Sequence, residues 1–363
     1  MKVLIAPDSF GSTLTARQAA EAIAAGWRQR APEDELVLAP MSDGGPGFIE
    51  VLHATLGGTV LSATVRSLYG DQTPATLLQV GDTVYVESAQ ACGPHLSERR
   101  EPEHASSFGA GQLVAAALEL GAKHIVIGLG GAGTNDAGAG LLAALGAHGD
   151  PGDALTNGPE GLAGLKSVDA SSARARLEGV DLTLATDVDL PLLGLRGTTN
   201  AFGKDRGIPG DRLQTVDAQL ERLAEATDRG VADARGAGAG GGMGFALLLL
   251  GGTGTDAISV VAHSVGLASL ARSADLVITG EGSFDFASRS GKVPYGVAAV
   301  AAEAVRPCIA LAGQVLVGSR EMRALGVESA YSMVDLVGRE RALGEPSASL
   351  SALAERVARS WSR

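Results

Sequence analysis

The chain has few cysteines, no long hydrophobic run and no excess of positive charge. Among its 363 residues only Cys92 and Cys308 are cysteines, which argues against a disulfide framework and favours a reducing, cytoplasmic compartment. No run approaches the roughly 20 apolar residues of a membrane helix, and no signal peptide precedes the first predicted strand. The formal net charge of −12 argues against non-specific nucleic-acid binding. We therefore expect a soluble, cytoplasmic protein that binds neither membranes nor nucleic acids.

Several catalytic signatures are also missing. The six histidines form no pair at metal-ligand spacing, and with two cysteines this argues against a zinc site. No G-x-S-x-G motif is present, so a Ser–His–Asp hydrolase lacks its local signature. The segment 282–292 contains a Gly-Lys pair but not the spacing of a P-loop. What remains is a set of acidic residues and glycine-rich loops.

Short apolar runs that alternate with segments of helical periodicity predict an α/β fold. Buried parallel strands are expected at 2–6, 36–39, 275–279, 308–312 and 329–333. Helices are expected at 15–28, 212–229, 258–271, 295–304 and 349–363. Between these regions, strands at 60–65, 76–80 and 83–87 alternate as in a mixed or antiparallel sheet. We predict two α/β domains: a discontinuous parallel-sheet domain of residues 1–62 plus 258–363, and an inserted mixed-sheet domain of residues 63–257.

Two glycine runs are candidate phosphate-binding loops. The first lies in HIVIGLGGAGTNDAGAG at 124–140, between an apolar strand and an expected helix, and the second is GAGAGGGMG at 236–244. Glycine lets the backbone approach a ligand, and successive amides or a helix N-terminus favour a phosphate. The candidate residues are Gly130, Gly131, Thr134, Asn135, Asp136, Gly240 and Gly241. Because the chain holds 51 glycines, a tight turn and a low-complexity linker are the respective alternatives.

The first loop also satisfies the dinucleotide fingerprint G-x-G-x-x-G at Gly128, Gly130 and Gly133. That fingerprint needs an acidic residue at the end of the next strand, about 20 residues further on. Asp150 lies near that distance, but its context, HGDPGD, is typical of a turn. A nicotinamide-dependent oxidoreductase is therefore kept as an alternative that the missing acid disfavours.

Acidic and small residues follow four predicted strands, at 2–6, 36–39, 181–185 and 275–279. These residues are Asp8, Ser9, Asp43, Gly44, Gly45, Asp187, Asp189, Glu281 and Asp285, with Lys292 as a nearby cation. Because ligands bind beyond the carboxyl ends of parallel strands, we expect Asp8 and Asp43 to lie near each other. Carboxylates and glycine amides suit Mg²⁺ and phosphates, and phosphoryl transfer needs charge neutralisation and a base. The residues favour a kinase outside the P-loop class, while a helix cap or turn is the alternative for each aspartate alone.

Six motifs together resemble the bacterial glycerate kinase family, of the glycerate 2-kinase type. They are APDSF at 6–10, SDGGPG at 42–47, GLGGAGTNDAGAG at 128–140, ATDVDLPL at 185–192, GAGAGGGMG at 236–244 and ITGEGSFDF…SGKVPYGVA at 278–298. They occur in family order and run through essentially the whole chain. The resemblance implies phosphorylation of D-glycerate by ATP and Mg²⁺, with the 2-hydroxyl as the expected acceptor. It also implies two α/β domains, of which the discontinuous one is flavodoxin-like.

The motifs depart from the family pattern at six positions. Gly11 stands where a lysine is usual, Ser283 where an arginine is usual, and Ala287 where a glutamine is usual. Ser42, Pro46 and Leu190 replace the usual alanine, glutamate and asparagine. Two cationic positions are therefore lost. Either Arg289, Lys204 or Arg206 compensates for them, or the acid substrate differs.

We assign roles in the candidate site as hypotheses. The loops at 130–133 and 238–242 hold the ATP phosphates, and Lys292 neutralises the transferred group. Asp43, Asp136 and Asp187 are the candidate Mg²⁺ ligands, and Asp187 or Asp189 is the candidate general base. An inactive metabolite-binding homologue and a kinase of another small hydroxy acid are the alternatives. The oligomeric state is left open, with a homodimer among the alternatives.

Overall fold

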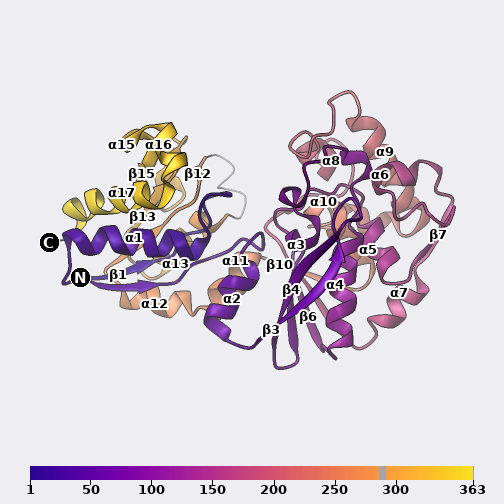
Figure 1. Cartoon of the computed structure of the whole chain (residues 1–363), viewed down its shortest axis with the longest axis horizontal. Helices are drawn as coiled ribbons and strands as arrows, with labels where there is room; N and C mark the ends of the chain where they lie inside the picture. The colour runs from indigo at the N-terminus through magenta and orange to yellow at the C-terminus, as the bar shows by residue number, and fades with distance from the viewer. Residues whose placement is uncertain (286–291, 363) are drawn as a thin grey trace. The chain divides into compact units, whose positions relative to one another are not determined.

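Figure 1 shows the computed structural model of the chain, which describes residues 1–285 and 292–362. The α-carbon contacts divide the chain into two compact units. Unit 1 comprises Met1–Asp43, Glu50–Leu56 and Ile258–Arg363, and unit 2 comprises Gly44–Ile49 and Gly57–Ala257. The predicted domain boundaries stay a prediction. The contacts group residues 57–62 with unit 2, because strand β3 (Thr59–Arg66) pairs along its whole length with strand β4 (Gln72–Val80).

Unit 1 is built on a parallel sheet with the strand order β15–β13–β11–β1–β2. Its strands are β1 (Lys2–Ile5), β2 (Glu35–Leu38), β11 (Leu276–Thr279), β13 (Cys308–Ala312) and β15 (Ser329–Ser332). Counted along this unit alone, the order is 2-1-3-4-5, the flavodoxin-like arrangement. The predicted parallel, flavodoxin-like sheet is therefore confirmed.

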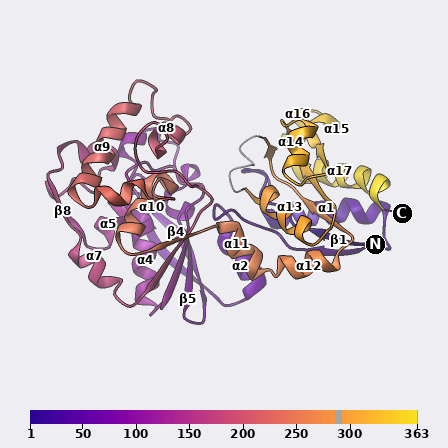
Figure 2. The same cartoon turned by 180° about the vertical axis from the view of Figure 1, so that it is seen from behind.

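Helices cover both faces of this sheet. The helices of unit 1 are α1 (Ala16–Arg30), α2 (Phe48–Leu56), α11 (Ala257–Ser264), α12 (Leu267–Ser273), α13 (Val293–Glu303), α14 (Ser319–Ala324), α15 (Met333–Val337), α16 (Arg339–Gly344) and α17 (Pro346–Trp361). The first residues of α2 and of α11 are grouped with unit 2, so these helices belong to unit 1 from Glu50 and from Ile258. Helices α1 and α17 lie side by side and share one core with alternate strand residues such as Val3 and Ile5. Helices α12 and α13 pack on β1, β11 and β13 from the other face, as Figure 2 shows.

The prediction of a single helix at 258–271 is wrong, because the structure contains two helices there. Helix α11 ends at Ser264 and α12 begins at Leu267. Between them Gly266 takes a left-handed conformation with φ of 64°, which glycine adopts without steric cost. The apolar periodicity continues across this break, so periodicity alone does not reveal it.

Unit 2 contains the mixed sheet with the order β10–β9–β6–β5–β4–β3. Besides β3 and β4, its strands are β5 (Thr83–Glu87), β6 (His124–Gly128), β9 (Asp181–Ala185) and β10 (Thr253–Thr255). The strands from β10 to β5 run parallel, and β4 and β3 continue the sheet antiparallel. The predicted mixed sheet is confirmed.

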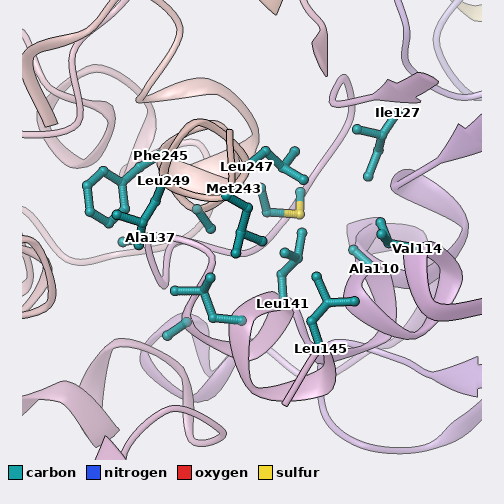
Figure 3. Close-up of a cluster of buried hydrophobic side chains, with 14 of the residues drawn as sticks. Ala110, Val114, Ile127, Ala137, Leu141, Leu145, Met243, Phe245, Leu247 and Leu249 are labelled. Atoms are coloured by element: carbon teal, nitrogen blue, oxygen red, sulfur yellow. The ribbon is translucent and has the colours of Figure 1, made fainter. Parts of the chain in front are cut away.

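The core of unit 2 forms where three helices meet beside this sheet. The α-helices of unit 2 are α3 (Ala89–Cys92), α4 (Phe108–Glu119), α5 (Ala139–Ala144), α6 (Gly158–Gly161), α7 (Ser171–Arg176), α8 (Thr198–Phe202), α9 (Leu213–Ala226) and α10 (Ala239–Leu249). Figure 3 shows Val114 of α4, Leu141 of α5, and Met243 and Phe245 of α10 in one buried cluster. This packing fixes the glycine loop before α5 and the glycine run in the first turns of α10.

The segment at 149–180 carries short elements. Strand β7 (His148–Asp150) pairs antiparallel with β8 (Ser167–Asp169) in a small separate sheet. Asp150 therefore ends a strand and does not lie in a turn, contrary to our expectation. Since β7 does not pair beside β6, the strand–helix–strand unit of a dinucleotide site is not formed here. Within the described residues, no helix combines the length and apolarity needed to cross a membrane.

Candidate functional site

A cavity of about 510 Å³ lies in unit 1 at the carboxyl ends of its parallel strands. Asp8 follows β1, Asp43 follows β2, and Glu281 follows β11, and all three line the cavity. In a flavodoxin-like order, β1 and β11 are the neighbours at which the strand order reverses, and ligands bind in the crevice there. The cavity thus occupies the position that this topology favours for a ligand.

The pKa of Asp8 is strongly perturbed in this cavity. Its side chain is buried, and its carboxylate Oδ1 accepts a hydrogen bond from the Ser9 backbone N–H at 2.7 Å. Burial, and then the negative charge of Asp43, raise the pKa of Asp8 well above the usual value for aspartate. Two neighbouring carboxylates of this kind favour either a shared proton or a bound cation.

Lys292 supplies a positive charge at the same cavity. It lies immediately before α13, and its Nζ is 3.6 Å from Oε2 of the buried Glu281. Its charge also opposes the rise in the pKa of Asp8. The cavity therefore brings together Asp8, Asp43, Glu281 and Lys292.

Two of the positions at which the motifs depart from the family pattern line this cavity. Gly11 and Ser283 both line it, and a Cβ atom at Gly11 would meet open space. Ser283 Oγ donates to Asp285 Oδ2 at 3.0 Å and accepts from Gln314 Nε2 at 3.2 Å. Ala287 and Arg289 lie outside the described residues. Arg339, at the start of α16, lines the cavity and was not singled out from the sequence, because nothing in its neighbourhood marks a site.

A second cavity, of about 640 Å³, lies in unit 2 against the first glycine loop. Gly130 and Gly131 both line it. A Cβ atom at Gly130 would come within 2.6 Å of the Gly45 nitrogen, and the Gly130 N–H donates to the Gly44 carbonyl at 3.1 Å. Gly44 and Gly45 thus pack against this loop, and glycine is needed at these positions for close backbone contact.

The second glycine run packs onto the first, so the two do not form separate cradles. Gly240, Gly241 and Gly242 all take positive φ inside α10. A Cβ atom on Gly241 would collide with the Thr134 carbonyl, and the Ala137 N–H donates to the Gly241 carbonyl at 3.0 Å. Gly240 lines the cavity, whereas Gly241 does not.

Asp136 does not line either cavity. Its fully buried carboxylate accepts hydrogen bonds from Ser107 N–H, Ser107 Oγ, Gly138 N–H and Gly140 N–H, at 2.8 to 3.2 Å. Burial raises its pKa, and these donors oppose the rise. We no longer propose Asp136 as a catalytic residue or metal ligand, because its oxygens are occupied in joining the starts of α4 and α5.

Thr134 and Asn135 are also fully buried and do not line the cavity. Asn135 Nδ2 donates to Thr199 Oγ1 at 2.9 Å, and its Oδ1 accepts from Arg206 Nη1 at 3.0 Å. Asn135 therefore contacts the cavity indirectly, through Arg206, which lines it.

The two aspartates after β9 differ from each other. Asp189 is more than half exposed and forms a bidentate pair with Arg235, with two N–O distances of 2.7 Å. Asp187 is half-buried, and its Oδ1 accepts from the Ala257 N–H at 3.2 Å. Neither lines the cavity of unit 2.

Glu87, which sequence reasoning missed, is a buried carboxylate at the carboxyl end of β5. Its Oε2 accepts from the Ile49 N–H at 3.2 Å. Burial raises the pKa of Glu87 to about 7 even though the N–H groups of Gly47, Phe48 and Ile49 oppose the rise. The available signal was its place at a strand end, the pattern that marks Asp8 and Asp43.

The comparisons with known proteins agree on one family. The model of the glycerate kinase family matches residues 3–362. The chain is 36% identical to a glycerate kinase of Bacillus subtilis, over 92% of this chain and 90% of that protein. It is 36% identical to glycerate 2-kinase of Escherichia coli, over 93% of this chain and 92% of that protein. A crystal structure assigned to glycerate kinase 2 of Salmonella typhimurium matches with a TM-score of 0.79 at 34% identity, and covers 99% of this chain and 98% of that chain.

Proposed function

Because the chain belongs to the glycerate kinase family, we propose that it phosphorylates D-glycerate at the 2-hydroxyl to give 2-phosphoglycerate. The family resemblance drawn from the six motifs is confirmed, and membership makes the chain a kinase with ATP as its phosphate donor. The names of the relatives support glycerate as the substrate, and the glycerate 2-kinase of Escherichia coli supports the 2-position.

The observation that carries this proposal is the grouping of Asp8, Asp43, Glu281 and Lys292 in the cavity of unit 1. Phosphoryl transfer needs charge neutralisation on the transferred group and a carboxylate to take the proton of the acceptor hydroxyl. Lys292, oriented by its ion pair with Glu281, supplies the neutralising charge. Asp8 takes the proton, since its raised pKa makes it a stronger base than an ordinary aspartate.

This assignment replaces Asp187 and Asp189 as candidates for the general base. Asp189 is held in an exposed ion pair with Arg235, and Asp187 accepts a hydrogen bond at the start of α11. Asp8, in contrast, is buried and lines the cavity of unit 1 together with Asp43, and neither Asp187 nor Asp189 lines that cavity.

The carboxylates in the cavity of unit 1 fit Mg²⁺. This ion is usually held by one or two carboxylates together with substrate phosphates and water. Among the described residues no group of three or more His, Cys, Asp or Glu side chains could hold a metal, which is compatible with such a site. Asp43 is the residue that would hold the ion, which leaves Asp8 to act as the base. When bound, Mg²⁺ supplies charge neutralisation on the phosphates.

A kinase of another small hydroxy acid is the second candidate. It is favoured by Gly11 and Ser283, which leave the cavity of unit 1 without the lysine and arginine usual in the family. An acceptor whose anionic group needs fewer cations would fit such a cavity.

The test is ATP consumption by the purified protein with Mg²⁺, with phosphorus NMR of the product from D-glycerate, L-glycerate and sugar acids. We expect a 2-phosphoglycerate signal from D-glycerate. Lys292→Gln should lower turnover by about 100-fold or more, because a charge aimed at the transferred group is lost. Lys166→Gln, which removes an exposed lysine paired with Asp150, is the matched control. Turnover of another acid but not of D-glycerate would support the second candidate, and Lys292→Gln turnover near wild type would contradict the assigned site.

A further inference from the structure

We propose that Arg206 and the backbone N–H groups of Gly131 and Ala132 form an oxyanion-binding site in the cavity of unit 2. The ligand group is a carboxylate or a phosphate. That this group belongs to a hydroxy acid or to ATP rests on the proposed function.

The guanidinium of Arg206 is held in one orientation. Its Nε donates to the Ala132 carbonyl at 3.3 Å, and its Nη1 donates to Asn135 Oδ1 at 3.0 Å and Thr198 Oγ1 at 3.2 Å. The Phe202 ring lies 5.4 Å from the guanidinium carbon. A guanidinium fixed in this way loses little side-chain entropy when an anion binds.

One edge of this guanidinium is unused. Nη2 of Arg206 makes no hydrogen bond to any residue that the structure describes, and Arg206 lines the cavity. In the same described part of the chain, the N–H groups of Gly131 and Ala132 donate to no partner. Both residues line the cavity, so Nη2 of Arg206 and these two N–H groups can all donate to one ligand. Such a set suits an oxyanion.

The charge around the cavity agrees with this ligand class. Arg99, Arg100 and Arg206 line it, against the single acid Asp205 among the lining residues that the structure describes. Burial lowers the pKa of Arg206 to about 10, so the side chain stays protonated at neutral pH. An anion can therefore be held here by arginines and amides, whereas acids outnumber cations among the described charged residues that line the cavity of unit 1.

If Arg206 has only a structural role, replacing it lowers the stability of the protein and leaves ligand binding unchanged. Its three bonds join the loop at 132–135 to α8, so its loss could lower stability without affecting any ligand. Ligand binding measured apart from turnover separates these roles.

The experiment is isothermal titration of the protein, without metal, with inorganic triphosphate and separately with D-glycerate. Arg206→Gln should weaken binding of one of these ligands by about 10- to 100-fold, the usual effect of a lost charge-assisted hydrogen bond. Weaker triphosphate binding assigns the site to the phosphates of ATP, and weaker D-glycerate binding assigns it to the carboxylate. Arg212→Gln is the matched control, since Arg212 is paired with Glu103 away from the cavity. Unchanged binding of both ligands by folded Arg206→Gln would overturn the proposal.

A second measurement uses the wild-type protein and does not depend on the stability of a variant. Amide hydrogen exchange at Gly131 and Ala132 should slow when the bound ligand engages these N–H groups. Exchange that stays the same at saturation with each ligand would also overturn the proposal. Anion binding through Arg206 without turnover of D-glycerate would instead contradict the proposed function and leave the oxyanion site standing.

Discussion

Replacing Glu87 with glutamine should make the protein less sensitive to pH. Glu87 is 5% exposed, and burial raises its pKa from 4.5 to about 7. Glutamine has nearly the same shape and keeps an oxygen that can accept from the Ile49 N–H, but it cannot ionise. The substitution therefore isolates the effect of burying a negative charge.

The sign follows from proton binding. Folded protein keeps the Glu87 proton up to about pH 7, whereas the unfolded chain releases it near the ordinary value of 4.5. The neutral carboxyl thus contributes its full stability below about pH 4.5, and this contribution is lost as the pH rises through 7. A shift of this size corresponds to about 3 kcal/mol.

The assay is urea unfolding of wild type and Glu87→Gln at several pH values from about 4.5 to 8. The free energy of unfolding of wild type, minus that of the variant, should fall by about 3 kcal/mol across this range. Taking the difference cancels the other titrating groups. Glu119→Gln, at an exposed position of α4, controls for the loss of one negative charge. A difference that changes by less than about 1 kcal/mol would refute the reasoning.

Three further changes have defined outcomes. Asp8→Asn should lower turnover by about 10²- to 10⁴-fold, because the general base is lost. It should also remove the acidic limb of the pH–rate profile, which lies above the usual aspartate range because the pKa of Asp8 is raised. An unaltered limb would show that another group is the base. Gly241→Ala should destabilise the protein by about 2–4 kcal/mol in denaturant unfolding, because its φ is 70° and a Cβ atom meets the Thr134 carbonyl; a loss below about 0.5 kcal/mol would show that the loops separate at low cost. Asp189→Asn should change turnover by less than about threefold and stability by less than about 1 kcal/mol, because its ion pair is exposed; a large fall in turnover would restore Asp189 as the general base.

The residues near the ends of the parallel strands could be located from the sequence. Buried parallel strands consist of short apolar runs, and their carboxyl ends share one edge of the sheet, so Asp8 and Asp43 were expected to be neighbours. Both line the cavity of unit 1. The six motifs, taken in their order along the chain, were enough to identify the family, although six of their positions depart from its usual pattern.

Tertiary structure decided what each polar group and glycine does. A glycine loop that binds a ligand and one that packs against another loop have the same local sequence, and the contact of Gly241 with Thr134 joins residues far apart in the chain. Asp136 is occupied by donors from Ser107 as well as from its own loop, which no local pattern reveals. The pKa of Glu87 depends on burial and on N–H groups near residue 48, and the unused edge of Arg206 depends on where its other donors are bound. Local sequence determines strands, turns and the chemical groups they carry, whereas burial and partners far along the chain determine which of those groups remain available to a ligand.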